Sequence, residues 1–336
     1  MTDRNQVMSP WFEDFSRGME FDAPAVTVTA GYAAVYQAIT ADRLRLPLDH
    51  ALASELLGGG QGLVHPMLTT NLAIGQSTWA SQRVKANLFY RGLVVRAPVQ
   101  LGDTLYTRTK VVGLRQNRRQ AGRAATGMVA LELHATNQRD ETVLHCWRCP
   151  MIPCHNPDAD TGHADSLDAL GNAPTRAELK SVLPAWKLQR TQRWLGPRAA
   201  DFADRDVVEI EPRDTITSAP ELVRLTLNMA MAHTDDSLSY LGERLVYGGH
   251  TISLAFSQLT RLMPNILTLV AWESCEHTAP VVENDRVRSV VTVLGREALA
   301  YDQGTLLRLK LETFAARGAP ETEARVLDWV LWVWSL

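Results

Sequence analysis

The chain has 336 residues, which is enough for about two domains at roughly 150 residues each. Hydrophobic residues make up 46% and charged residues 21% of the chain, which excludes a disordered tail, a collagen-like chain and a coiled coil. The formal net charge of -3 excludes the strongly basic surface that nucleic-acid binding requires, so we expect no nucleic-acid partner.

Neither end of the sequence suggests export or membrane insertion. The N-terminal residues contain no apolar run, so we expect no signal peptide. The longest apolar stretch, VLDWVLWVWSL at 326–336, is shorter than the roughly 20 residues of a membrane-spanning helix and is predicted to be a buried strand. Four cysteines cannot cross-link a chain of this size. We therefore expect a reducing, cytoplasmic location and no membrane partner.

The predicted elements follow one another in the same order in both halves. Each half begins with a short segment that ends in Val and Thr, continues with an apolar segment of helical spacing (63–74 and 254–262), and then has three strand-like runs separated by turn residues. In the first half these runs are TLYTRTKVVGL, GMVALELHATN and TVLHCWRCPMI. In the second half they are RVRSVVTVLG, LLRLKLETFAA and ARVLDWVLWVW.

The two halves also share a sequence repeat. Pro98 and Pro280, each in an Ala-Pro-Val start, stand 182 positions apart, and Val143 and Val326 stand 183 apart. A helix followed by antiparallel strands predicts an α+β fold in which a sheet wraps around a helix, twice in one chain. The predicted units are 1–152, a connecting arm at 153–196 and 197–336. The arm is rich in Asp, Gly and Pro, and Trp186 and Trp194 indicate that its later part packs on the body.

Three segments carry a resemblance to a known family. VYGGHTISLA (246–255), TKVVGLRQN (109–117) and EDFSRGMEF (13–21) resemble the MaoC-like hydratases and dehydratases, and most closely the mesaconyl-CoA (2-methylfumaryl-CoA) hydratase branch. This resemblance implies a double hotdog fold, which consists of two long helices each wrapped by an antiparallel sheet. It also implies the reversible addition of water to an enoyl-CoA thioester with a branched or dicarboxylic acyl group, without a cofactor.

The family motif has Asp, then His five residues later, then Asp two residues further on. In LNMAMAHTDD the matching residues are Asn228, His233 and Asp235, so Asn replaces the first Asp. A neutral imidazole suits the deprotonation of water, so we assign the base role to His233. Asn228 cannot take a proton, and we expect its carbonyl oxygen to orient the water. Two roles stay open for Asp235: it orients His233, or it faces solvent.

The thioester oxygen needs backbone N–H donors. Gly248 and Gly249 precede ISLAFSQL, which is predicted to be a helix, and a helix N-terminus offers unpaired amides. Glycine at these positions lets an acyl group approach the backbone, and the resemblance implies that the Gly249 amide binds the thioester oxygen. Arg244 is the candidate cation for a second carboxylate on the acyl group.

The first half is predicted to have lost these groups. With a repeat offset of 183, the glycine pair aligns with His65 and Pro66, and proline has no N–H to donate. Asp42 begins a motif-like stretch, but Pro47 stands where the histidine belongs. We therefore expect the first half to complete the fold and shape the acyl or CoA pocket, while the second half does the chemistry.

Other interpretations stay open. The motif C-x-x-C-x4-C-H at 146–155 offers four candidate zinc ligands, but Cys146 and Cys149 lie in a predicted strand whose neighbours alternate faces, so the ligands are not expected to converge. We therefore expect buried thiols and no metal. A hotdog thioesterase would need a carboxylate near the second helix, and 252–260 contains none. A non-catalytic acyl-CoA binding protein would need neither His233 nor Gly249. The sequence leaves open whether two chains form a homodimer.

Overall fold

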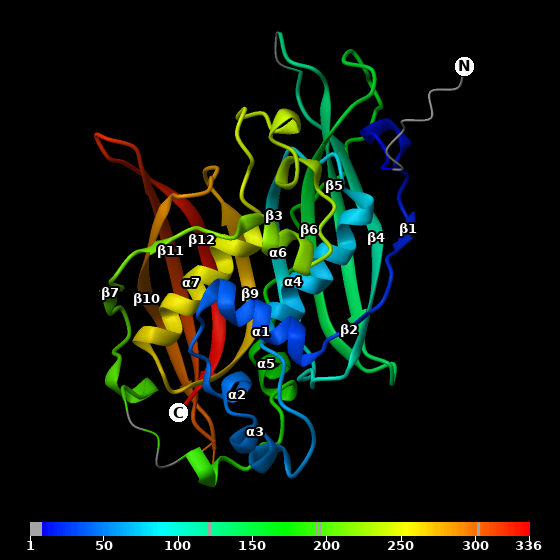
Figure 1. Ribbon diagram of the computed structural model, residues 1–336. Helices are drawn as coiled ribbons and strands as arrows, with labels where there is room; N and C mark the ends of the chain where they lie inside the picture. The colour runs from blue at the N-terminus through cyan, green and yellow to red at the C-terminus, as the bar shows by residue number, and fades with distance from the viewer. Residues whose placement is uncertain (1–8, 120–121, 192–193, 195, 301–302) are drawn as a thin grey trace.

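The computed structural model describes residues 9–119, 122–191, 194, 196–300 and 303–336 (Figure 1). The first repeat contains β1 (Glu20–Asp22), β2 (Val26–Thr27), α1 (Ala30–Thr40), α2 (Arg45–Leu48), α3 (His50–Leu57), α4 (Pro66–Gln76), β3 (Ala86–Val95), β4 (Thr104–Gln116), β5 (Thr126–Thr136) and β6 (Thr142–Pro153). The second contains β7 (Val207–Glu209), β8 (Asp214–Thr215), α6 (Ala219–Leu225), α7 (Gly248–Leu262), β9 (Ile266–His277), β10 (Arg286–Ala298), β11 (Thr305–Arg317) and β12 (Thr322–Ser335). Between them lies α5 (Arg176–Ser181).

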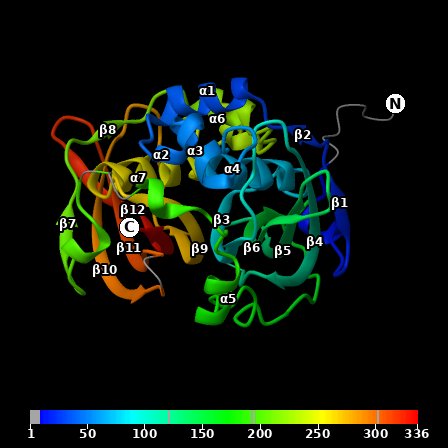
Figure 2. The same ribbon diagram turned by 90° about the horizontal axis from the view of Figure 1, so that it is seen from below.

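One antiparallel sheet runs through both repeats. Its strand order is β1-β4-β5-β6-β3-β9-β12-β11-β10-β7, with β2 paired to β4 and β8 paired to β10. The repeats meet where β3 pairs with β9, with Tyr90 opposite Cys275 and Leu93 opposite Trp272. Figure 2 shows the curved sheet with α4 and α7 on one side and α5 on the other. This arrangement confirms the predicted α+β class and the two helices wrapped by antiparallel strands.

The predicted strands are all present, but each repeat has one more long strand than expected. β3 and β9 follow directly after the helices and lie at the centre of the sheet. Much of β9 is buried on both faces, so its sequence is a nearly continuous apolar run rather than an alternation. Such a run cannot be distinguished from a buried helix by periodicity alone, which is why the pattern missed it.

Helices α4 and α7 pack against each other across the repeat. The Nδ2 amide of Asn71 donates to Ser253 Oγ at 2.9 Å, and these residues stand 182 positions apart. Pro66 and Gly248, the first residues of the two helices, have the same spacing. Every residue of α4 is buried, as expected of a helix enclosed by a sheet and a second helix.

This spacing corrects the predicted alignment of the glycine pair. The counterpart of Gly249 is Met67, not Pro66, because the two helices begin at Pro66 and Gly248 with an offset of 182, whereas the offset of 183 holds for the last strands, β6 and β12. Met67 has an N–H, but this group donates to Nδ1 of His65 at 3.1 Å. The amide in the first repeat is therefore occupied rather than missing.

The connecting arm packs on the body. Its Leu167, Leu179 and Trp194 are buried, and Trp186 stacks on Trp334 with ring centroids 5.3 Å apart. These contacts explain the tryptophans in an otherwise polar segment. Within the described residues, no helix has the length and apolar character needed to cross a bilayer.

Candidate active site

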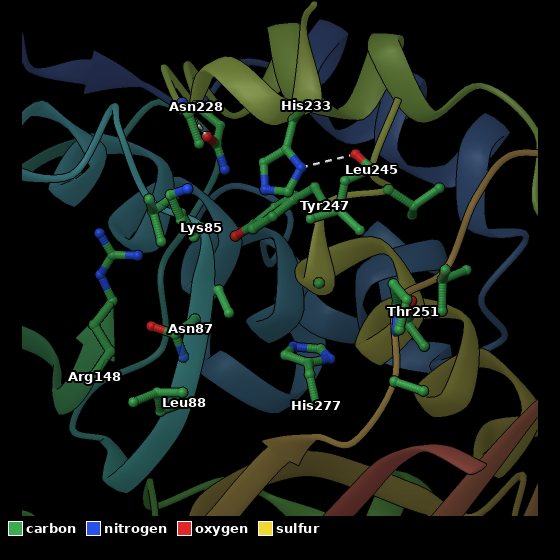
Figure 3. A pocket seen from close by; sticks show the side chains of 18 of the residues that line it. Lys85, Asn87, Leu88, Arg148, Asn228, His233, Leu245, Tyr247, Thr251 and His277 are labelled. Carbon is green, nitrogen blue, oxygen red and sulfur yellow. Dashed lines mark hydrogen bonds between the residues drawn. The ribbon is translucent and has the colours of Figure 1, made fainter. Parts of the chain in front are cut away.

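A cavity of about 260 Å³ lies where the two repeats meet (Figure 3). Both repeats contribute to its wall. The first repeat supplies Thr78, Val84, Lys85, Ala86, Asn87, Leu88, Tyr90 and Arg148, and the second supplies Asn228, Ala230, His233, Tyr240, Leu245–Gly248, Thr251 and 277–281. The structure therefore brings Asn228, His233 and Gly248 to one cavity, whereas Gly249, the third predicted catalytic residue, is not among the lining residues.

His233 presents one ring nitrogen to this cavity. It ends a short 3-10 turn (Met231–His233), and its Nδ1 donates to the carbonyl oxygen of Leu245 at 2.8 Å. This bond places the proton of the neutral ring on Nδ1 and leaves Nε2 as an acceptor. Burial is the main cause that lowers the pKa of His233 to about 4, and the charge of Arg148 adds to it. The imidazole is therefore unprotonated at neutral pH and able to accept a proton.

Asn228 is held by its backbone neighbours. It follows α6 and Leu227, which has a positive φ of 55°, and its Oδ1 accepts the amide of Ala230 at 2.9 Å. The next amide, that of Met229, donates to Thr78 Oγ1 of the first repeat at 2.8 Å. Because Oδ1 is engaged with the backbone, the Nδ2 group faces the cavity (Figure 3). We expected the side-chain carbonyl oxygen of Asn228 to orient a water, but the structure presents the Nδ2–H donor to the cavity instead.

The glycine pair opens α7, with Tyr247 as its N-cap residue. Gly248 lines the cavity, and a Cβ there would lie 2.2 Å from Nε2 of His277. At Gly249 a Cβ would lie 2.0 Å from Oδ1 of Asn71. Neither position has room for a side chain, so the helix N-terminus, with its unpaired amides, stays close to the cavity.

Comparison with known proteins places this site in a family. No family model matches the chain. The chain is 30% identical over 315 residues to the mesaconyl-CoA hydratase of Cereibacter sphaeroides, covering 90% of this chain and 88% of that protein. The chain belongs to the mesaconyl-CoA hydratase family of MaoC-like proteins.

Two solved structures agree with this family. A conserved hypothetical protein of Mycobacterium tuberculosis with a double hotdog fold is 43% identical, with a TM-score of 0.90, and the match covers 98% of this chain and 100% of that one. A putative MaoC domain dehydratase of Chloroflexus aurantiacus is 26% identical, with a TM-score of 0.87 and 97% of both chains covered. The double hotdog fold and the MaoC-like hydratase/dehydratase class are thereby shown.

Two residues that the sequence analysis assigned to substrate binding, Asp235 from the family motif and Arg244 as a candidate cation, do not line the cavity. The carboxylate of Asp235 is exposed and caps the next turn by accepting from the amide and hydroxyl of Ser237. Arg244 pairs with Glu283 at 2.5 Å. Neither lines the cavity wall, so the structure favours the solvent-facing interpretation of Asp235 and shows Arg244 already neutralised by a neighbour.

Arg148 is a cavity residue that the sequence reasoning missed. It projects from β6, is only 3% exposed, and donates through Nη2 to Ser81 Oγ and to the carbonyl oxygen of Ser77. The sequence held a signal: in TVLHCWRC the arginine occupies an inward position, two residues after buried Cys146, where an alternating strand carries apolar residues. A charge at such a position is worth examining as a functional residue.

His277 is the second missed residue. It ends β9, and its Nε2 is buried with no hydrogen-bond partner beside Gly248. Burial, together with the nearby ring of His233, lowers the pKa of His277 to about 4, so the cavity contains two neutral imidazoles. No local sequence pattern marks this histidine, because its place beside Gly248 at the start of α7 depends on tertiary packing at the end of β9.

The cysteine-rich segment does not form a ligand cluster. Cys146 lies in the main core, whereas Cys149 packs with Phe89 and Leu167 in a separate apolar cluster. Burial raises the pKa of both thiols to about 12, so they stay protonated. Among the described residues, no group of three or more His, Cys, Asp or Glu is arranged to hold a metal ion.

The first repeat has a reduced counterpart of the site. Asp42 follows α1 and accepts the amide of Leu44, just as Asn228 accepts that of Ala230. Its Oδ1 lies 3.2 Å from Nε2 of His65. The remaining cavity has only about 30 Å³. Its wall includes Pro47, Pro66 and, from the arm, Trp186.

Proposed function

We propose that this chain adds water reversibly across the double bond of an enoyl-CoA thioester with a branched or dicarboxylic acyl group, like that of mesaconyl-CoA. One observation carries the proposal: a neutral imidazole with a free Nε2, an amide donor and a helix N-terminus surround one cavity. These are the groups that water addition to a conjugated thioester requires. The mesaconyl-CoA hydratase to which the chain is 30% identical acts by its name on such a substrate.

The proposed mechanism begins with a water held between Asn228 and His233. The Nδ2–H of Asn228 donates to the water oxygen, and Nε2 of His233 accepts one of its protons. The oxygen then forms a bond to the β-carbon, and the π electrons of the double bond move through the α-carbon onto the thioester oxygen. Imidazolium His233 returns its proton to the α-carbon, which restores the thioester, and dehydration follows the same steps in reverse.

The negative charge on the thioester oxygen needs stabilisation, and we assign this role to the start of α7. Gly248 gives the acyl group access to the backbone, and the amide of Gly249 is the proposed donor. One such donor typically contributes about 3–4 kcal/mol to the transition state. His277, beside Gly248, is placed to keep the carbonyl in position.

The wall of the cavity argues against a thioesterase. Hotdog thioesterases need a carboxylate to activate water, and none of the described residues that line this cavity is Asp or Glu. The cations Lys85 and Arg148 line it instead, which suits an anionic ligand. A CoA thioester entering past exposed Lys85 meets a cation before its acyl end reaches His233.

The test is direct. Purified protein is incubated with crotonyl-CoA and mesaconyl-CoA, and loss of the enoyl absorbance is followed alongside release of free thiol. Enoyl loss without thiol release supports the proposal, thiol release at the same rate supports a thioesterase, and binding without either change indicates a binding protein. An Asp235→Asn variant is the matched control, because Asp235 belongs to the motif but lies outside the cavity; it should retain activity.

We also propose a reducing cytoplasmic location, which the four free and buried cysteines support. A homodimer stays a prediction. Light scattering of the purified chain distinguishes a dimer from a monomer, and a monomer with full activity would show that the internal pair of repeats is sufficient.

A further inference from the structure

Arg148 is a buried cation without a counter-charge. Its Nη2 contacts a carbonyl and a hydroxyl, its Nε is buried with no partner, and none of the described carboxylates forms an ion pair with it. Burying an unpaired guanidinium opposes folding, because the charge loses its hydration and gains no opposite charge. A fold retains such a group only where something else compensates, and a bound anion is the simplest compensation.

The other repeat shows what the fold needs at this position. In the strand register, Arg148 of β6 lies opposite Tyr90 of β3. The equivalent residues of the second repeat are Leu331 of β12 and Trp272 of β9, which also lie opposite each other. Leu331 is fully buried in the apolar core. The sheet is therefore satisfied by an apolar side chain here, so Arg148 is not required for strand pairing or core packing.

We infer that Arg148 is the specificity-determining residue that binds a second carboxylate on the acyl group of the substrate. This inference rests on the proposed function. The guanidinium is planar and donates along parallel N–H directions, so it can hold a carboxylate that enters the cavity in a bidentate pair. Lys85 is the other cation of the wall, but it is exposed and hydrated, which suits the cavity mouth rather than a buried acyl group.

The position of Arg148 agrees with the chemistry. In a mesaconyl-type acyl group the carboxylate is attached to the carbon that receives water, so its binding site must share a cavity with the base. Arg148 and His233 line the same cavity from opposite repeats, and the charge of Arg148 reaches His233 strongly enough to lower its pKa. A monocarboxylic acyl group such as crotonyl leaves Arg148 unpaired, so the site discriminates against it.

The test compares two substrates in wild type and an Arg148→Met variant. The variant should lower kcat/KM for mesaconyl-CoA by about 10- to 150-fold, the range for a hydrogen bond to a charged group. It should change kcat/KM for crotonyl-CoA by less than about threefold, because that substrate makes no such bond. Arg148→Lys keeps the charge but loses the planar bidentate donor group, so its kcat/KM for mesaconyl-CoA should lie between those of wild type and Arg148→Met. Arg91→Met is the matched control, since Arg91 lies next to Tyr90 on β3 and packs over Phe89 outside the cavity wall.

A binding measurement separates this inference from the proposed function. Calorimetry with succinyl-CoA and butyryl-CoA, which have no double bond to hydrate, should show tighter binding of succinyl-CoA in wild type and a loss of that preference in Arg148→Met. If neither enoyl-CoA is hydrated but the preference depends on Arg148, the hydratase proposal fails and the carboxylate site stands. If crotonyl-CoA is hydrated and mesaconyl-CoA is not, or if Arg148→Met affects both substrates equally or neither, the carboxylate site is wrong.

Discussion

The Asn228→Asp variant tests the protonation state on which the mechanism depends. The substitution keeps the shape of the side chain and the bond to the Ala230 amide, but it brings a carboxylate into the cavity that His233 also lines. An opposite charge within about 4–6 Å raises the pKa of an imidazole by about 1 to 3 pH units. The pKa of His233 should therefore rise from about 4 to between about 5 and 7.

The sign of the pH effect follows from the base role. A base is active when unprotonated, so kcat/KM falls as the pH drops through its pKa. At pH 5.5 wild-type His233, with its pKa of about 4, keeps more than about nine-tenths of the active form. A variant with a pKa near 6 keeps about a quarter. The ratio of kcat/KM at pH 5.5 to that at pH 8 should be near unity in wild type and about fourfold lower in Asn228→Asp.

The assay is enoyl-CoA hydration between pH 5.5 and 8.5, with circular dichroism at each pH to show that the fold persists. Asp42→Asn is the matched control, because it makes the reverse change at the equivalent position of the first repeat, beside His65 and outside the cavity that His233 lines. Its pH profile should match that of wild type. A wild-type acid limb near pH 6.5, or identical profiles for Asn228→Asp and wild type, would refute the assignment of a buried neutral base.

Three further outcomes are expected. His233→Ala should lower kcat by about 100- to 10,000-fold with an unchanged urea midpoint, and full activity would remove His233 from the mechanism. Gly248→Ala should lower kcat/KM by about 100-fold, because the new Cβ would displace His277. In the control Gly295→Ala the Cβ meets nothing within 4 Å, so kcat/KM should change little. Equal effects of the two substitutions in kinetic assays would contradict this prediction. Burial lowers the pKa of His250 to about 4, so the unfolded chain binds protons more readily than the native one and stability falls as the pH drops from about 6.5 toward 4. In urea unfolding, the free energy of unfolding of wild type should fall by about 2 kcal/mol more between pH 7 and pH 5 than that of His250→Leu. An equal fall in the two proteins would show that His250 is not the cause.

The amino-acid sequence by itself determined the repeat, the fold class and part of the site. Helices and strands arise from periodic burial along the chain, so the alternation in β4 and β10 and the glycine start of α7 could be predicted locally. The two polar residues Asn228 and His233 could be assigned to one site from the sequence, because both lie on one short segment after α6.

The tertiary structure alone decided what depends on contacts between the repeats. Arg148 and His233 stand on different repeats and line one cavity only because β3 pairs with β9. The amide of Asn228 is oriented by a backbone bond, and Arg244 is neutralised by Glu283, neither of which a residue pattern records. Local periodicity reports which face of an element is buried, but it does not report what that face meets across the molecule. The sequence marked Arg148 only as a charge at an inward strand position, and the folded chain alone shows that Arg148 and His277 line one cavity with His233.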